Sequence, residues 1–201
     1  MTYILLGDLL ERLKEILVNP VTAILKAKKE KDLTKTLLIL IYSWLSIGVS
    51  FFLFYRSSSM LIAFGSSLAI FLFGILFSLF YSYLIGIVMN ILGGKGKYYE
   101  SLTATTYSSL PISLGLLLMS ILFAINTMLG IIIGFFVIAI TTALSLSIYF
   151  RAIKEFYSTD MLIVFLGFLI ILYVLMIAVY ISIGFSIGSS LFGKLISNLN
   201  I

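Results

Sequence analysis

The sequence predicts an all-α membrane protein, a bundle of five transmembrane helices preceded by an N-terminal amphipathic helix. The composition is the first observation behind this, because 62% of the 201 residues are hydrophobic and only 10% are charged, unlike a soluble domain. The second is that Asp, Glu, Lys and Arg are absent from three long runs, 57–94, 101–150 and 161–193. Each run exceeds the ~20 residues that cross a ~30 Å hydrocarbon layer, so the chain is expected to lie in a bilayer.

Residues 1–35 are predicted to be a cytoplasmic amphipathic helix followed by a basic juxtamembrane segment. Apolar side chains recur there at three- and four-residue spacing, at Leu6, Leu9, Leu10, Leu13, Ile16 and Leu17, and charged residues fill the other side. Asn19 and Pro20 close this helix. It either docks against a partner or the protein's own cytoplasmic face, or lies in the membrane interface. The lysines between 26 and 35 are expected to anchor the first span at anionic headgroups.

The region 36–201 is predicted to hold five spans, at about 36–55, 68–92, 105–124, 128–150 and 161–184. The run 57–94 would be about 57 Å long as one helix, so a break is expected at Gly65, Ser66 and Ser67. Asn126 and Thr127 supply the turn between the third and fourth spans. A hairpin of two spans within 57–94 is the alternative, and it would reverse the orientation of everything downstream.

The distribution of Lys and Arg predicts the orientation, because these residues are retained on the cytoplasmic side. With five spans and a cytoplasmic N-terminus, only Arg56 and Lys194 fall outside. Eleven fall inside: Arg12, Lys14, Lys26, Lys28, Lys29, Lys31, Lys35, Lys95, Lys97, Arg151 and Lys154. A hairpin within 57–94 would move the last four outside, so the charges favour five spans. The C-terminus is then expected outside, and the plasma membrane is the expected location.

Small and polar residues form rows within the spans that predict helix packing. One row recurs every four residues along the second span, at Gly74, Ser78, Ser82, Gly86, Asn90 and Gly94. The third span carries a matching row, Ser101, Thr105, Ser109 and Ser113. Four-residue spacing stays on one helix face, and small residues there let a neighbouring backbone approach closely. The two rows are therefore expected to face each other, and their hydroxyls could alternatively line a polar path.

Pro111 lies inside the third span, where it is expected to kink the helix because it frees the carbonyl of Tyr107. Hydroxyls of Thr106, Ser108 and Ser109 are expected to satisfy the backbone around it. No Asp, Glu, Lys or Arg lies deep in a span, and five spans do not divide into equal halves. Ion-coupled transport is therefore disfavoured.

The loop of Gly93, Gly94, Lys95, Gly96 and Lys97 is the most distinctive local string. It is either a turn whose lysines obey the positive-inside rule or, with Arg151 and Lys154, a surface that contacts headgroups or a partner. It lacks the GxxxxGK[ST] order of a phosphate-binding loop. The chain contains no Cys or His and no HExxH or GxSxG string. No catalytic residue, metal site, cofactor or nucleic-acid partner is therefore expected.

The string GGKGKYYESLTATTYSSLP, residues 93–111, resembles the Yip domain. Asn19–Pro20 and the segment 149–160 are similar too, so the resemblance covers residues 18–184. It implies a polytopic membrane protein without catalytic activity. Eukaryotic members bind Rab/Ypt GTPases and help organise secretory membranes. The short N-terminal segment departs from that pattern and resembles a prokaryotic member, so the GTPase partner is not carried over.

Two functional hypotheses follow from these patterns. In the first, the protein is a non-catalytic interaction or membrane-organising module in the lipid bilayer, with a cytoplasmic protein partner bound through the N-terminal helix. In the second, it is a channel or carrier for a small uncharged solute that passes along the serine and threonine rows. Rows of small residues serve contacts within one chain and between copies equally well, so a homo-oligomer is compatible with either hypothesis.

Overall fold

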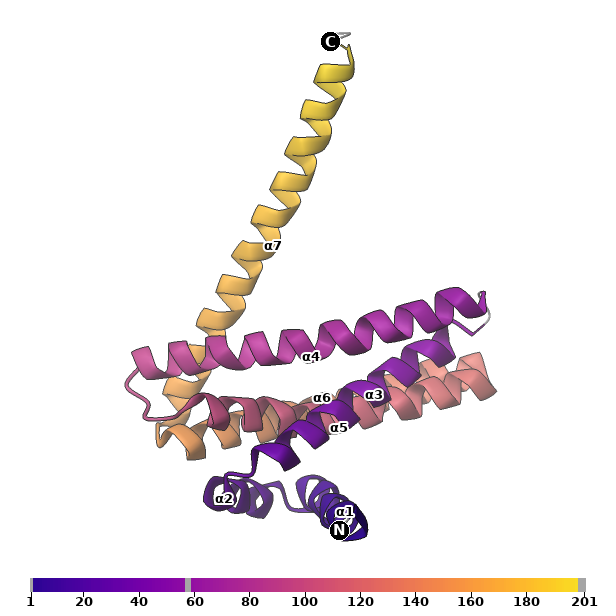
Figure 1. The fold of residues 1–201 in the computed structure, drawn as a ribbon. Coiled ribbons are helices and arrows are strands. Elements are labelled where there is room, and N and C mark those ends of the chain that lie inside the picture. Colours follow the sequence, from indigo (N-terminus) through magenta and orange to yellow (C-terminus); the bar gives the residue numbers. More distant parts are fainter. Residues whose placement is uncertain (1, 57–58, 199–201) are drawn as a thin grey trace.

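The computed structural model describes residues 2–56 and 59–198, with side chains over 7–56 and 59–183, and all its regular structure in these ranges is α-helical (Figure 1). In chain order the helices are α1 (Thr2–Val18), α2 (Pro20–Glu30), α3 (Leu33–Phe54), α4 (Met60–Ile91), α5 (Tyr98–Ile125), α6 (Thr127–Tyr157) and α7 (Met161–Asn198). Helices α3 to α7 are the five that are long and apolar enough to cross a membrane. The predicted five-span helical membrane fold is confirmed.

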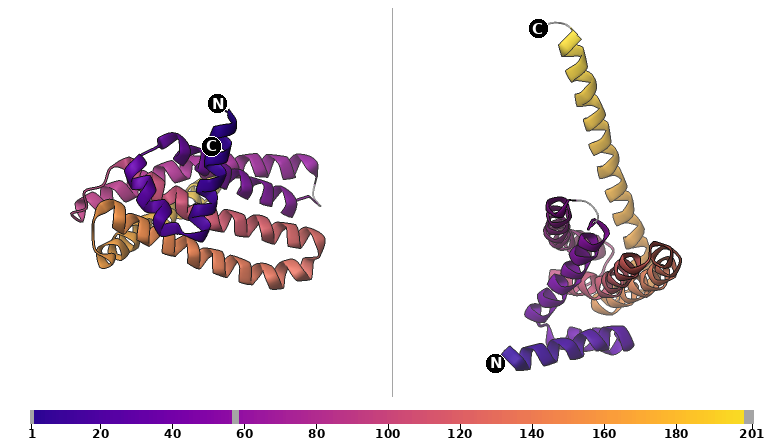
Figure 2. Two further views of the ribbon diagram at one scale, coloured as in Figure 1. Left: turned by 90° about the horizontal axis from the view of Figure 1, so that it is seen from below. Right: turned by 90° about the vertical axis from the view of Figure 1, so that its right-hand side faces the viewer.

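Helices α3 to α6 run lengthwise beside one another, whereas α1 and α2 lie against the flank of this bundle and α7 leans away from it (Figures 1 and 2). The connections at 31–32, 92–97 and 158–160 lie towards one end of the bundle, called here the loop end. The end of α3 at Phe54, the start of α4 at Met60 and the connection at Asn126 lie at the opposite end, the far end. Helix α5 occupies the centre, because it contacts α1, α2, α3, α4 and α6.

The first half of α5 is polar and yet is the most enclosed part of the bundle. Every residue from Ser101 to Tyr107 is buried. The hydroxyls of Thr103 and Thr105 donate to carbonyls one turn earlier, at 2.8 and 2.9 Å, so these polar groups are satisfied within the helix. Lipid tails are as apolar as Leu, so helices in a bilayer associate through close packing of small residues rather than through burial of apolar ones. The polar stretch is therefore placed inside.

The predicted break at Gly65–Ser67 is wrong, because α4 runs without interruption from Met60 to Ile91. Its start is set by Ser59, whose hydroxyl accepts the amide N–H of Ile62 at 3.4 Å. The serines at the expected break bond helical carbonyls: the Ser66 hydroxyl donates to the Ala63 carbonyl within α4, and that of Ser67 to the Gly48 carbonyl of α3. With 32 residues, α4 is about 48 Å long, longer than the hydrocarbon layer.

Helices α5 and α6 also extend beyond the predicted spans at the loop end. Helix α5 begins seven residues before the predicted position 105, where the Lys97 amide donates to the Glu100 carboxylate at 2.7 Å. Helix α6 passes Arg151 and ends at Tyr157, and the φ of 51° at the next residue, Ser158, is left-handed. Charged residues mark where hydrocarbon ends but do not end a helix, so the helical ends project beyond the apolar layer.

Helix α2 was not predicted, because the sequence patterns identified this segment only as a basic stretch. Pro20 occupies its first turn, a position where a missing N–H costs nothing. Ala23, Ile24 and Ala27 are buried at helical spacing, and this spacing was the signal available in the sequence.

The first half of α7 packs on the bundle. Val164, Gly167 and Ile171 are buried, and the sulfur of Met89 lies 2.8 Å from where a Cβ on Gly167 would stand. Every described side chain from 176 to 183 is exposed. In a membrane these side chains face lipid or another protein.

Candidate functional site

The glycine-lysine loop encloses one aromatic ring. A Cβ on Gly94 would lie 2.9 Å from Cδ1 of Tyr157, and a Cβ on Gly96 would overlap the same ring. The Lys95 amide also donates to the Tyr157 carbonyl at 3.3 Å. Gly93 adopts a φ of +89°, which side chains rarely tolerate. The glycines therefore fit the loop onto the end of α6. Tyr157, which no sequence motif singled out, is the residue that organises this turn.

The four cations predicted as a contact surface lie at the loop end. Lys95 and Lys97 are exposed on the loop. One turn of α6 carries the other two: Arg151, 44% exposed, pairs with Glu155 at 3.0 Å, and Lys154 is half-buried. The bond between the loop and Tyr157 ties these two segments together. Their role in headgroup or partner contact remains a prediction.

Helices α1 and α2 are joined by charged contacts around Arg12. This guanidinium is only 3% exposed, pairs with Glu30, lies 3.5 Å from Glu15, and donates to the Ala23 carbonyl at 3.3 Å. Removing an arginine from such a site would leave partly buried carboxylates without a partner. The two helices therefore form one unit.

This α1–α2 unit docks on the chain's own bundle. Ile16 and Ile24 are fully buried and belong to the same apolar cluster as Ala152 and Phe156 of α6. The lysines of the basic segment take part in this docking. Lys28 donates to the carbonyl of Glu155, and two others form ion pairs: Lys31 with Glu100 at 3.5 Å and Lys35 with Asp8. Of the interpretations left open for the N-terminal helix, docking on the protein's own surface is the one seen in the structure.

The outer face of the α1–α2 unit still carries exposed apolar side chains. Leu10 is 59% exposed and Val18 is 74% exposed, and Val21 and Leu25 are also exposed. The packing described above does not use them. The same segment thus combines a buried, ion-paired inner side with an apolar outer side.

The packing row of α4 lies mostly against aromatic side chains. A Cβ on Gly74 would overlap the Trp44 ring of α3, and the Trp44 indole N–H donates to the Ser78 hydroxyl at 2.8 Å. Ser82 is fully buried, and its hydroxyl donates to the Ser78 carbonyl at 2.6 Å. Towards the loop end Gly86 lies near Tyr157, whereas Asn90 is exposed. The sequence could not reveal these aromatic partners, because they come from other helices.

The matching row of α5 meets the α4 row near the loop end, and Ser78, Thr105 and Ser109 of the two rows line one groove. A Cβ on Gly86 would lie 3.6 Å from the Ser101 hydroxyl. Ser101, Thr105 and Ser113 are buried and Ser109 is half-buried. All four hydroxyls donate to carbonyls of α5 itself, at 2.8–2.9 Å. The rows therefore serve as inner surfaces of the bundle, and that they face each other along their whole length remains a prediction.

Pro111 is buried within a helix that continues through it. The hydroxyls of Ser108 and Ser109 donate to the carbonyls of Thr105 and Thr106. Neither of them bonds the Tyr107 carbonyl, which is the one that the proline leaves without an N–H partner. The Thr106 hydroxyl itself has no partner in the described part of the chain. The kink remains a prediction.

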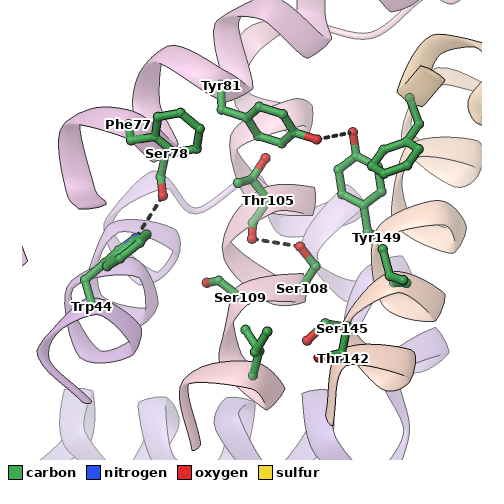
Figure 3. A pocket seen from close by; sticks show the side chains of 13 residues that line it. Trp44, Phe77, Ser78, Tyr81, Thr105, Ser108, Ser109, Thr142, Ser145 and Tyr149 are labelled. Carbon is green, nitrogen blue, oxygen red and sulfur yellow. Dashed lines mark hydrogen bonds between the residues drawn. The ribbon is translucent and has the colours of Figure 1, made fainter. Parts of the chain in front are cut away.

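A groove of about 300 Å³ lies among α3 to α7, and Ser78, Thr105 and Ser109 of the two rows line it (Figure 3). Asn90 lines a separate, smaller pocket with Tyr83 and Gly86. The channel hypothesis places these residues along one path, but in the described structure they line a groove and a separate pocket. This arrangement gives that hypothesis no support.

Comparison with known proteins identifies one family. The Yip1 domain matches residues 14–194, which is most of the chain. The match includes the end of α1, all of α2 and the five spans. No curated protein and no solved structure matches the chain.

Proposed function

Because the chain belongs to the Yip1 domain family, we propose that it is a membrane-embedded module without catalytic activity that binds a protein partner through the α1–α2 unit and the neighbouring loop end. The observation that supports this most directly is the docking of α1 and α2 on α5 and α6. Ion pairs and buried contacts hold two helices that still expose Leu10 and Val18. A preformed surface binds without the entropic cost of ordering a free segment.

The proposed orientation places the loop end in the cytoplasm and the far end outside, in the plasma membrane. The Lys and Arg residues of the 92–97 loop and of the end of α6 lie at the loop end, and those of α1 and α2 lie on the flank of the bundle, whereas Arg56 lies at the far end. The positive-inside rule relates this asymmetry to topology.

The orientation can be tested with single introduced thiols, because the chain contains no cysteine of its own. Impermeant maleimide added to intact cells is expected to label Arg56→Cys, while Lys95→Cys becomes labelled only after permeabilisation. Labelling of Lys95→Cys in intact cells would contradict the orientation and the cytoplasmic partner together. Denatured samples of both variants control for expression and reactivity.

The partner proposal is tested by in-cell photo-crosslinking. A photoreactive amino acid replaces Val18 on the α1–α2 unit, or Tyr55 at the far end as a matched exposed control. A discrete adduct is expected from Val18 and none from Tyr55, and charge reversal at Lys95 and Lys97 is expected to lower its yield. An adduct twice the chain's mass would identify a second copy as the partner. Equal adducts from both positions would contradict a partner site at the loop end.

A further inference from the structure

The groove among α3 to α7 combines an apolar body with a buried hydroxyl, that of Ser145, which has no hydrogen-bond partner in the described structure. Trp44, Phe77, Tyr81, Tyr149 and Phe168 supply aromatic walls, and Ser or Thr side chains of α5 and α6 gather on its inner side (Figure 3). None of the residues that line it is charged. A site of this kind accepts an uncharged, mainly apolar group and offers it a few hydrogen bonds.

Ser145 distinguishes the groove from ordinary packing space. It is 8% exposed, and its hydroxyl has no hydrogen-bond partner in the described structure. Figure 3 shows this oxygen directed towards the side of the groove where Ser109 lies. Three other hydroxyls of the groove have partners, since Ser108 and Ser109 donate to carbonyls of α5 and Ser78 accepts from Trp44. Buried polar groups are normally paired. The hydroxyls of Ser43 and Thr106 also lack a partner in the described structure, but only Ser145 of these three residues lines the groove.

The depth of the groove matches the boundary between lipid headgroups and lipid chains. Thr105 lies seven residues from the start of α5, about 10 Å along the helix, and Ser145 lies twelve residues before the end of α6, about 18 Å. Helix α4 exceeds a ~30 Å hydrocarbon layer by about 18 Å. At the loop end the charged residues Glu100 and Arg151 mark where the apolar layer ends, and Ser145 lies six residues, about 9 Å, further inside than Arg151. Lipid ester groups lie at this boundary, and the groove, which Tyr149 also lines, extends from their level into the hydrocarbon.

We propose that the groove holds one acyl chain of a membrane glycerolipid, with an ester carbonyl accepting a hydrogen bond from the Ser145 hydroxyl. The uncharged lining excludes the headgroup, so the site recognises the chain and its ester and does not select among headgroups. A volume of about 300 Å³ is at the lower end of small-molecule sites and fits one chain rather than a whole lipid. This inference does not depend on the partner proposed above.

The test uses the full chain reconstituted in phosphatidylcholine vesicles that contain a small fraction of phosphatidylcholine with a diazirine on one acyl chain. After irradiation, peptide mass spectrometry is expected to place the adduct on residues 105–112 and 142–149. Ser145→Ala is expected to lower the yield at these positions about fivefold, the effect of losing one hydrogen bond. The matched control is Ser120→Ala, a buried serine of α5 that does not line the groove.

A second variant, Ile112→Phe, narrows the groove from a half-buried position in its lining. It is expected to suppress the adduct further, in protein that elutes as the wild type does on gel filtration. If it does not fold, Ser145→Ala against Ser120→Ala still decides the question. The proposal is overturned if Ser145→Ala labels as strongly as Ser120→Ala, or if labelling is spread over the exposed faces of α4 and α7. Cross-linking of the groove to a second copy of the chain would overturn it too.

Discussion

Helices α5 and α7 reverse the pattern of a soluble protein. Helix α7 is the most apolar of the five spans and α5 the least apolar, yet α5 is surrounded by other helices and every described side chain of α7 beyond Leu175 is exposed. In water the more apolar helix would be buried, because removal of apolar surface from solvent drives folding. In lipid that drive is absent. Apolarity in this molecule therefore indicates contact with the membrane, whereas small or polar residues indicate the interior.

The largest expected effect on stability comes from comparing a leucine-to-alanine substitution in α5 with one in α7. Leu110 of α5 is fully buried, whereas Leu172 of α7 is 46% exposed. Leu110→Ala is expected to destabilise the bundle by about 2–4 kcal/mol, because it leaves a cavity, and Leu172→Ala by about 0.5 kcal/mol or less. Unfolding in detergent can be followed by the fluorescence of Trp44, the only tryptophan. Equal losses would contradict the contrast between the two helices.

Enlarging a glycine tests the interior in the opposite direction. A Cβ on Gly115 of α5 would overlap Thr141 of α6, whereas one on Gly65 of α4 would meet open space. Gly115→Leu is expected to cost about 1–3 kcal/mol through overpacking, and Gly65→Leu to be neutral or slightly stabilising. Thermal denaturation in the same detergent checks both variants. A Gly65→Leu protein as unstable as Gly115→Leu would show that the outer face of α4 is also packed.

A smaller effect is expected where the α1–α2 unit covers α5. Arg12→Ala removes a buried guanidinium that pairs with Glu30 and Glu15. Both carboxylates are partly exposed, so solvent screens the loss, and a destabilisation of about 1–2 kcal/mol is expected. A rise in hydrogen exchange confined to α1 and α2, with the second half of α5 unchanged, would locate the effect. Lys14→Ala, on an exposed side chain, serves as the control.

The smallest effect is a dependence on pH. The hydrogen bond from Lys35, together with the charge of that residue, lowers the pKa of Asp8 below its usual value. A carboxyl whose pKa is lowered by folding stabilises the folded state above its unfolded pKa, and this stabilisation is lost as pH falls through the lower value. Wild-type α1 is therefore expected to exchange amide hydrogens more slowly than Asp8→Asn at about pH 6, with the difference shrinking as the pH falls through the lowered pKa of Asp8. A difference that persists at low pH would contradict this.

The number of spans was predictable from the sequence, but their ends were not. Long uncharged runs reveal where hydrocarbon must be crossed, and this holds whatever the packing is. The ends depend on local bonds that composition does not display. Ser59 starts α4, and Glu100 starts α5. Ser66 and Ser67 suggest a break in the sequence, but their hydroxyls bond backbone carbonyls and the helix continues.

At the candidate site too, part of the arrangement was predictable from the sequence and part was not. Glycines and lysines at 93–97 marked the loop as unusual, and their spacing suggested a turn or a contact with headgroups. That the turn encloses Tyr157 could not be predicted, because this ring lies two helices further along the chain, at the end of α6. The same holds for Trp44 against Gly74. Rows of small residues predict that another helix packs closely against them, but they do not identify the side chain that occupies the space.

Composition and length were enough to establish a helical membrane protein with five apolar helices and an asymmetric distribution of basic residues, because transfer into hydrocarbon depends on these properties. The folded arrangement was needed to show that the polar first half of α5 is central and that α1 and α2 dock on α5 and α6. It was also needed to show that Tyr157 and Trp44 fill the glycine positions. Those choices arise from shape and hydrogen bonding between residues far apart in the chain, which no local pattern encodes.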